Sequence, residues 1–526
     1  MGMDIFSNYI NSLKDTGNTQ RDEKNKVVEN LHDNSYEVEK IQMLKEICSK
    51  LDNLNKVQPV QNPMPYIQTT SQVSSDDTVD MVIENGNVVL PDNGVFNTNV
   101  YIKDGKIYAV GNNLQIKAKC VIDAANKYVM PGIIDPHIHL GLFAPLEEEL
   151  RSETQAALIG GITTVGSYFA SKGSHLETFP DTIETIGSNS FVDIIPHLVI
   201  SNDDQRKEII DYTNELGVTS FKIYMNGIPG LIPDVDDGFI LDVFDEIKKS
   251  SKKCIVCAHA ENRYMVQRAY KMIFESKGNN ATIKDWTDTH PSMAEEEAAE
   301  RLSYLAKESK VPVYFVHISS EAAIEKLRSI KPFNKYVNVE TTSPYLSLTR
   351  HSSNTNNIKM EPPFRDDEDV EALWKALEDD VIDSIGTDNV TMTKAEKRID
   401  EDIWTTIPGY GVLQTHLPVL LNKGINEKGL RIDQLIGKVT KKPAEIFGVY
   451  PQKGTIMPGS DADIVIVDMN LTKEVKADEL STRSDFSIYE GSSLKGWPVM
   501  TIKSGKVVAK NGSLVESKSL GKCLYR

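Results

Sequence analysis

The sequence predicts an α/β protein in which a (β/α)8 TIM barrel stands beside a small β-sandwich. Residues 130–452 alternate between short apolar runs, typical of buried strands, and segments with the periodicity of amphipathic helices. Repeated β–α alternation of this length indicates a parallel barrel or an open doubly wound sheet. β-rich segments flank this region at residues 78–129 and 453–515, and we expect them to pair into one sandwich.

Individual segments support this plan. Apolar residues recur with helical spacing in EEELRSETQAALIGG, EAAIEKLRSI and DVEALWKALEDD. Asn85–Gly86 and Asp104–Gly105 interrupt the first β-rich segment and predict two hairpin turns. Outside the two domains, the sequence indicates a polar, amphipathic helical extension at residues 1–57, a proline-containing linker at 58–77 and a tail at 516–526.

Composition excludes several classes of protein. A net charge of −18 over 526 residues argues against nucleic acid as a partner, because binding to phosphates needs concentrated Lys and Arg. No run of about 18 apolar residues is present, so no segment is expected to cross a membrane. The first residues lack the pattern of a signal peptide, and five scattered cysteines fit a reducing cytoplasm.

Residues with metal-ligand chemistry stand in five of the strand-like runs. The run from Val129 closes on His137 and His139, which point to the same face of a strand and can reach one ion. The runs VTSFKIYM, CIVCAH, VPVYFVH and VIDSIGTD carry Lys222, His259, His317 and Asp388. In a (β/α)8 barrel the strand ends gather at one mouth, where the active sites of that fold lie.

Each of these residues also has an ordinary explanation. A lone histidine at a strand end is more often a core or surface residue, Lys222 could be a snorkelling side chain, and Asp388 could be a helix N-cap. Their coincidence decides between the two interpretations, because four of only ten histidines fall on strand ends of one βα array. The sequence therefore predicts a metal site at the barrel mouth.

Long segments of the chain resemble the amidohydrolase superfamily and, within it, the cyclic amidohydrolases: dihydropyrimidinase, hydantoinase and allantoinase. The resemblance spans about Asp80 to Gly512. It rests on PGIIDPHIHLG, SETQAALIGGITTV, VTSFKIYM, AHAEN, HPSMAEEEAAERL, VHISS, EPPFRDDEDVEALW, GTDN, KPAEIFGVYPQKGTIMPGSDADIVIVD and YEGSSLKGWPV, in the expected order.

This resemblance implies two divalent metal ions, with zinc expected. It assigns the ligands to His137, His139, Lys222, His259, His317 and Asp388. The first two histidines and the aspartate would hold the more buried ion, the other two histidines the second. The lysine would bridge both as a carbamate, since burial favours the neutral amine that takes up carbon dioxide. The metals would turn a shared water into a hydroxide nucleophile, and Asp388 would pass its proton to the departing amide nitrogen.

The substrate pocket departs from the proteins that the chain resembles. Hydantoinases and dihydropyrimidinases carry a tyrosine five residues after the lysine, where this chain has Gly227, and Tyr224 is nearby but is expected elsewhere on the strand. The serine before their Pro-Pro pair is Glu361 here, and their Ile-Pro-Asn-Gly loop reads IPGYG, with Gly409 and Tyr410. We treat Gly227, Glu361, Gly409 and Tyr410 as candidate substrate contacts. Glu361 either favours a substrate rich in N–H donors or positive charge, or is a surface carboxylate.

The resemblance predicts an enzyme that opens a hydantoin- or dihydropyrimidine-like ring and releases an open-chain N-carbamoyl or amide acid. An allantoinase-like enzyme and a cyclic-imide hydrolase are alternatives with the same chemistry. A non-catalytic scaffold, like the dihydropyrimidinase-related neuronal proteins that have lost metal ligands, is the alternative of another class, and the complete ligand set favours the enzyme. A homodimer or homotetramer is expected from the relatives.

Two apolar helical stripes mark the N-terminal extension. They are formed by Ile5, Phe6, Tyr9, Ile10 and Leu13, and by Ile41, Leu44, Cys48 and Leu51. Such brief helices need a partner surface, so the extension either packs on its own barrel, forms a tail, or docks elsewhere. It resembles the encapsulation peptides of enzymes carried inside bacterial microcompartments, which would make a shell protein its partner.

Overall fold

The central sheet is parallel throughout in the structure, a computed structural model that describes residues 78–112, 114–228, 231–353 and 355–526. Its segments are β6 (Ile133–His139), β7 (Ile162–Phe169), β8 (Asp193–Val199), β9 (Ser220–Tyr224), β10 (Ile255–His259), β11 (Val313–Phe315), β12 (Val337–Thr342), β13 (Ser384–Gly386) and β14 (Asn389–Val390). Neighbours in the sheet follow chain order from β6 to β13.

The sheet closes on itself through its last two segments. β14 begins directly after Thr387 and Asp388, which follow β13, and it pairs in parallel with β6. In that pairing Asn389 opposes Ile138 and Val390 opposes His139. β13 and β14 therefore serve as the eighth strand of a closed barrel, and the predicted TIM-barrel fold is confirmed.

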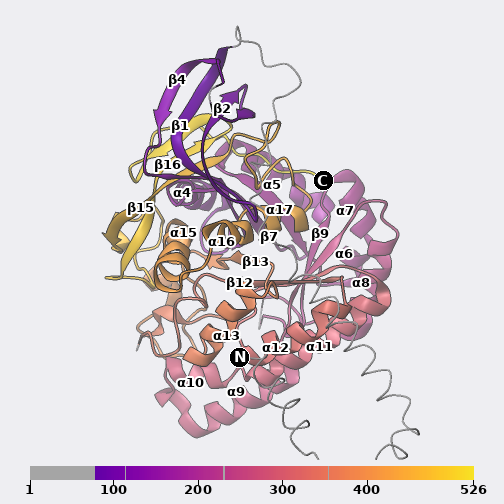
Figure 1. Cartoon of the computed structure of the whole chain (residues 1–526). Helices are drawn as coiled ribbons and strands as arrows, with labels where there is room; N and C mark the ends of the chain where they lie inside the picture. The colour runs from indigo at the N-terminus through magenta and orange to yellow at the C-terminus, as the bar shows by residue number, and fades with distance from the viewer. Residues whose placement is uncertain (1–77, 113, 229–230, 354) are drawn as a thin grey trace, which may run out of the picture. The chain divides into compact units, whose positions relative to one another are not determined.

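Helices connect the barrel strands and bury apolar residues against them (Figure 1). The three helices expected from periodicity are confirmed as α4 (Leu146–Ile159), α12 (Glu321–Ile330) and α13 (Asp367–Glu378). The remaining α-helices are α5 (His175–Asn189), α6 (Asp203–Lys207), α7 (Ile209–Glu215), α8 (Asp237–Lys248), α9 (Arg263–Lys277), α10 (Ile283–Asp288), α11 (Ser292–Ser309), α14 (Lys394–Lys397), α15 (His416–Leu420), α16 (Ile432–Lys438) and α17 (Lys441–Ile446). Among the helices described, none is both long and apolar enough to cross a membrane.

Short helical turns complete the connections. They are η1 (Gly278–Asn280), η2 (Lys331–Phe333), η3 (Asn356–Ile358), η4 (Leu413–Thr415), the π-helical η5 (Leu421–Glu427) and η6 (Ala477–Glu479).

The two β-rich flanks form one further sheet. Its strands are β1 (Thr78–Leu90), β2 (Gly94–Lys103), β3 (Lys106–Val110), β4 (Lys117–Asp123), β5 (Tyr128–Pro131), β15 (Ile464–Glu474), β16 (Ser493–Lys503), β17 (Lys506–Lys510) and β18 (Ser513–Leu514). The N-terminal and C-terminal strands meet where β5 pairs antiparallel with β15, and Figure 1 shows the indigo and yellow segments side by side. The predicted second domain built from both flanks is thus confirmed, while the exact domain boundaries stay a prediction.

One predicted hairpin turn is wrong. Asp104–Gly105 does connect the antiparallel strands β2 and β3, as expected. Asn85–Gly86 instead lies inside β1, where the pairing with β2 shifts register between Ile83 and Gly86. Asn85 has a φ of 61°, so the Asn-Gly pair forms a bulge that bends a long strand. The turn to β2 follows Leu90 instead.

A buried ion cluster fixes the flanking sheet to the barrel. The Lys453 ammonium lies 2.5 Å from Asp193 of β8, 2.9 Å from Asp461 and 2.6 Å from Asp463, and it is 2% exposed. Lys503 of β16 adds a second ammonium 2.7 Å from Asp193. The three carboxylates converge closely enough to hold a cation. Because ammonium groups already neutralise them, we interpret the cluster as structural.

Replacing Lys453 with Met should destabilise the protein, because buried carboxylates lose their central cation. We expect the free energy of unfolding to fall by about 3–5 kcal/mol, visible as a lower thermal midpoint. Lys106→Met is the matched control, since this half-exposed lysine pairs with Asp461 from the solvent side and should contribute less than about 1 kcal/mol. Equal midpoints for the two variants would contradict this account.

Candidate metal centre

Three predicted ligands converge on one point at the mouth of the barrel. The Nε2 atoms of His137 and His139 lie 3.1 Å and 3.2 Å from the same oxygen, Oδ1 of Asp388. Strand pairing sets this arrangement, because the Asp388 amide donates to the His137 carbonyl at 2.9 Å. The three donor atoms lie close enough together to hold one metal ion.

The protonation of His137 shows which of its atoms is free to bind. Its Nδ1 donates to Glu340 Oε1 at 2.8 Å, because a carboxylate can only accept. In the neutral ring Nε2 then carries the lone pair, and it is buried without a hydrogen-bond partner among the described residues. A lone pair facing a carboxylate oxygen at 3.1 Å is unfavourable unless a proton or a metal ion lies between them. The geometry therefore fits a metal ligand.

His317 and His259 lie beside this cluster, with their rings packed in sequence next to the ring of His137. The ring centroids of His137 and His317 are 5.4 Å apart, and those of His317 and His259 are 4.5 Å apart. Nδ1 of His317 is buried without a hydrogen-bond partner in the described part of the chain. Nε2 of His259 donates to Glu261 at 2.7 Å, which leaves its Nδ1 as the atom that can bind a metal. Burial, followed by His259, lowers the pKa of His317 well below its ordinary value and keeps it in the neutral, ligating form.

Lys222 is fully buried in β9, in the strand predicted for it. Its Nζ lies 4.9 Å from the ring centroids of both Tyr168 and Tyr224. The Tyr168 ring is in turn 4.6 Å from the ring of His137. Burial lowers the pKa of Lys222 to about 8, although Cys257, Asp388 and Glu340 oppose the shift. A substantial neutral fraction near pH 8 is what carbamate formation requires.

Two ligand positions adopt a backbone conformation that is rare for residues with a side chain. His317 has a φ of 43° and Asp388 a φ of 54°. His317 stands two residues beyond β11, and Asp388 lies between β13 and β14. Left-handed backbone of this kind costs free energy and concentrates at functional sites. It also shows that Asp388 is not a helix N-cap.

Sequence reasoning missed the carboxylates that hold the ligands. Glu340, inside β12, accepts from His137, from the His317 amide at 3.0 Å and from the Tyr314 hydroxyl at 2.7 Å. Asp135 accepts from the His137 amide at 3.1 Å and from Thr387 Oγ1 at 2.6 Å. Burial raises the pKa of Asp135 to about 8. Both residues link strands that carry ligands, a role that second-sphere carboxylates have in metal sites.

Glu261 has the corresponding role for His259. Besides His259, it accepts from His290 Nδ1 at 2.9 Å and from the side-chain amide nitrogen Nδ2 of Asn226 at 3.1 Å. Burial alone would lower the pKa of His290, but Glu261 outweighs it and raises this pKa above the ordinary value. The signal was available in the sequence, because Glu261 stands two residues after His259 in AHAEN.

Gly227 cannot supply the contact that a tyrosine makes in the proteins the chain resembles. Its φ is 70°, and a Cβ there would lie 2.7 Å from the Asp234 amide nitrogen. Tyr224 lies beside the candidate ligands: its ring is 5.9 Å from the ring of His259, and its ring centroid is 4.9 Å from Lys222 Nζ. A phenolic ring therefore lies near the candidate ligands, three residues before the position that carries the tyrosine in the proteins the chain resembles.

The other substrate candidates are placed as follows. Gly409 packs against β14, since a Cβ there would lie 2.8 Å from Val390 Cβ. Tyr410 is fully buried, its hydroxyl has no hydrogen-bond partner in the described chain, and burial together with Asp388 raises its pKa well above the ordinary value. Glu361 is half-buried, and its charge acts on His290. Gly409, Tyr410 and Glu361 remain candidate substrate contacts, and so does the position of Gly227.

The predicted segments at residues 1–57 and 58–77 lie outside the described residues. The homodimer or homotetramer expected from the sequence also stays a prediction.

Comparison with known proteins identifies the family. The profile of the "Amidohydrolase family" matches residues 128–508, so the chain belongs to that family. This match confirms the resemblance drawn from the sequence motifs. It also supports the use of divalent metal, together with the cluster of His137, His139 and Asp388.

Within the family, the chain is similar to hydantoinases and dihydropyrimidinases, as predicted. It is 30% identical to a D-hydantoinase of Ralstonia pickettii, over 85% of this chain and 99% of that protein. It is 28% identical to an L-hydantoinase of Paenarthrobacter aurescens, over 85% and 98%. The crystal structure of a dihydropyrimidinase from Brevibacillus agri superposes with a TM-score of 0.79 at 26% identity, covering 85% of this chain and 98% of the other.

Replacing Glu340 with Gln should weaken metal binding, because the ligand His137 loses its anionic partner. We expect an affinity loss of about 10–100-fold, measured by competition with a chelator. Glu371→Gln is the control, since Glu371 is exposed on the surface and pairs with Lys428. An unchanged affinity in Glu340→Gln would show that this carboxylate does not support the metal site.

Proposed function

We propose that this protein is a metal-dependent hydrolase that opens the C–N bond of a cyclic amide or ureide with a hydantoin- or dihydropyrimidine-like ring. The observation that supports it most is the convergence of His137 Nε2 and His139 Nε2 on one oxygen of Asp388, next to two further histidines and a buried lysine. The names of the similar proteins supply the substrate class.

Two divalent ions fit the donor set. His137, His139 and Asp388 would hold one, His259 and His317 the other, with Lys222 as the bridging carbamate. Imidazole and carboxylate donors of this kind suit zinc, which we propose as the metal. When bound, such a pair lowers the pKa of water and polarises a carbonyl group.

Asp388 moves the proton in this proposal. Its carboxylate stands where Nε2 of His137 and Nε2 of His139 converge, at 3.1 Å and 3.2 Å from Oδ1, so it lies beside the proposed metals and their water and can accept a proton. The attacking water gives that proton to Asp388 as its oxygen bonds to the ring carbonyl carbon. When the C–N bond breaks, Asp388 returns the proton to the departing nitrogen. The product is an open-chain N-carbamoyl or amide acid.

Tyr224 and Glu361 are our candidates for recognition of the ring. The hydroxyl of Tyr224 can donate to the carbonyl oxygen, which is the task that Gly227 cannot perform. Glu361 can accept from ring N–H groups. Its carboxylate is the chain's clearest difference from the similar enzymes, so we propose that it sets ring preference.

Location and assembly belong to the same proposal. We propose a cytoplasmic enzyme that acts as a homodimer or homotetramer. Docking of residues 1–57 to a microcompartment shell is kept as a prediction from the sequence.

The direct test incubates the metal-loaded full chain with hydantoins, dihydropyrimidines, allantoin and cyclic imides, and follows the gain of one water by mass. We expect turnover of at least one ring class, and Asp388→Asn should lower kcat by about 10²–10⁴-fold. Asp245→Asn, a surface control, should leave kcat unchanged. Fewer than one metal per chain with no ring opening would instead support the scaffold class.

Two variants test the proposed roles of Tyr224 and Glu361 separately: one tests the contact to the carbonyl oxygen, the other the preference among rings. Tyr224→Phe should lower kcat/KM for every ring that is opened, because the carbonyl loses a donor. Glu361→Ser should change the rank order of the rings while metal content stays constant. If the rank order is the same in Glu361→Ser, Glu361 is the surface carboxylate of the alternative interpretation.

A further inference from the structure

The connection between β15 and β16 leaves the flanking sheet and lies against loops of the barrel mouth. We call residues 475–492 the strap. Hydrogen bonds close its base, where the Val475 amide donates to the Ser492 carbonyl at 2.9 Å. Along its length, the Ser481 amide donates to Gln414 at 2.8 Å, and the Tyr489 hydroxyl lies 2.8 Å from Ser347 Oγ.

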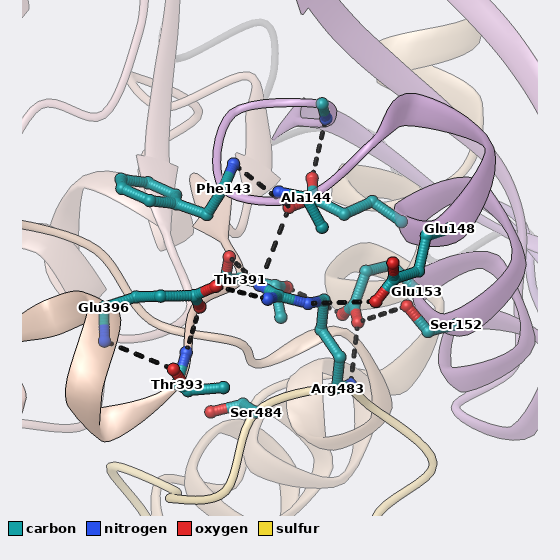
Figure 2. A network of polar contacts seen from close by, with 12 residues as sticks. Phe143, Ala144, Glu148, Ser152, Glu153, Thr391, Thr393, Glu396, Arg483 and Ser484 are labelled. Atoms are coloured by element: carbon teal, nitrogen blue, oxygen red, sulfur yellow. Dashed lines mark hydrogen bonds and ion pairs between the residues drawn. The ribbon is translucent and has the colours of Figure 1, made fainter.

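Arg483 of the strap binds the loop that follows Asp388. Its Nη1 donates to the Thr391 carbonyl at 3.3 Å, and its Nη2 lies 2.6 Å from Glu396 Oε1. Glu396 also accepts from the Thr393 amide at 2.7 Å and so caps α14. Figure 2 shows the guanidinium between Glu396 and Thr391 on one side and Glu148 on the other.

The same residue reaches the loop that follows His139. Nη1 of Arg483 lies 3.7 Å from Glu149 Oε1. Glu149 accepts from three backbone amides of that loop, those of Gly141 (2.6 Å), Phe143 (3.3 Å) and Ala144 (3.1 Å). Glu149 therefore fixes the path of the chain two residues beyond a candidate ligand.

Glu153 ties the strap to both loops at once. It accepts from the Arg483 amide at 3.1 Å, from Thr482 Oγ1 at 2.9 Å and from Thr391 Oγ1 at 2.7 Å. Glu149 and Glu153 are each only 1% exposed. Burial raises the pKa of Glu149, and Arg483 is the cation that acts against this shift. Two buried carboxylates of α4 and one guanidinium thus join the strap to the loops after β6 and β14.

We propose that Arg483 is a positioning residue that holds the loops following His139 and Asp388 in one fixed relation, and with them the candidate metal ligands. A planar guanidinium suits this role, because it can bind several oxygens in different directions at once. The loops begin two and three residues after candidate ligands, so their displacement would move His139 and Asp388 apart. This role rests on the proposed function, but the mechanical link can be measured without turnover.

The test compares Arg483→Gln with Arg483→Lys, and with Arg328→Gln as a surface control that also loses two ion pairs. Hydrogen exchange of the full chain is followed in peptides covering residues 141–149 and 391–398, with β15 as an internal reference. Metal affinity is measured by chelator competition, and kcat and KM on the best ring of the panel. We expect faster exchange in both loops, with affinity or kcat reduced about 10–100-fold, and partial rescue in Arg483→Lys.

Failure of this proposal can be distinguished from failure of the proposed function, because hydrogen exchange and metal affinity are measured without turnover. Unchanged exchange in both loops overturns the positioning role, whatever the activity. Faster exchange with unchanged metal affinity and kcat reduces Arg483 to a structural residue and also overturns it. If no ring is opened by the unmodified protein, exchange and metal affinity still decide. If Arg483→Gln does not fold, Glu396→Gln, which removes the charge from one of the ion pairs of Arg483 and keeps an oxygen to cap α14, is measured in the same way.

Discussion

The pairing of β14 with β6 is the constraint on which the candidate site depends. It joins residues some 250 positions apart in the chain, and it sets Asp388 beside His137 and His139 through backbone hydrogen bonds. Asp135 and Thr387 lock the same junction with a buried side-chain hydrogen bond at 2.6 Å. The strand pairing that closes the barrel therefore also brings the candidate ligands together. A barrel that stayed open at this seam would lack the cluster.

The barrel and the ligand positions could be predicted because local patterns determine them. Apolar runs mark the strands, and in a parallel barrel all strand ends share one mouth, so polar residues at those ends must meet. That argument made His137 and His259 candidates, whereas Lys222 stands inside β9 and became a candidate ligand through the family resemblance. The bulge at Asn85–Gly86 shows the limit of such patterns, because an Asn-Gly pair favours positive φ both in a turn and in a bulge.

The supporting carboxylates could not be found in this way. Glu340 is a single acidic residue inside β12, and nothing in its neighbourhood distinguishes it from an ordinary polar position of a strand, whereas Asp135 and Glu261 each stand two residues from a candidate ligand. Their roles depend on which strands lie side by side, which is a property of the whole fold. For Tyr224 the sequence shows that Gly227 stands in the tyrosine's place, but only the fold shows that the ring of Tyr224 lies 5.9 Å from the ring of His259. Residues with ligand chemistry at strand ends can be predicted from sequence, whereas contacts that depend on which strands and loops lie side by side cannot.

The charge balance of the site leads to the same conclusion as its geometry. Glu340, Glu261 and Asp388 are buried carboxylates around four histidines, and Lys222 is the one buried ammonium among the described ligands. Each carboxylate gains hydrogen bonds, but buried anions without cations are costly. If Lys222 becomes a carbamate, the excess of negative charge grows further. Two divalent cations, as proposed, would balance this charge. The proposed metal ions and the buried carboxylates would therefore stabilise each other.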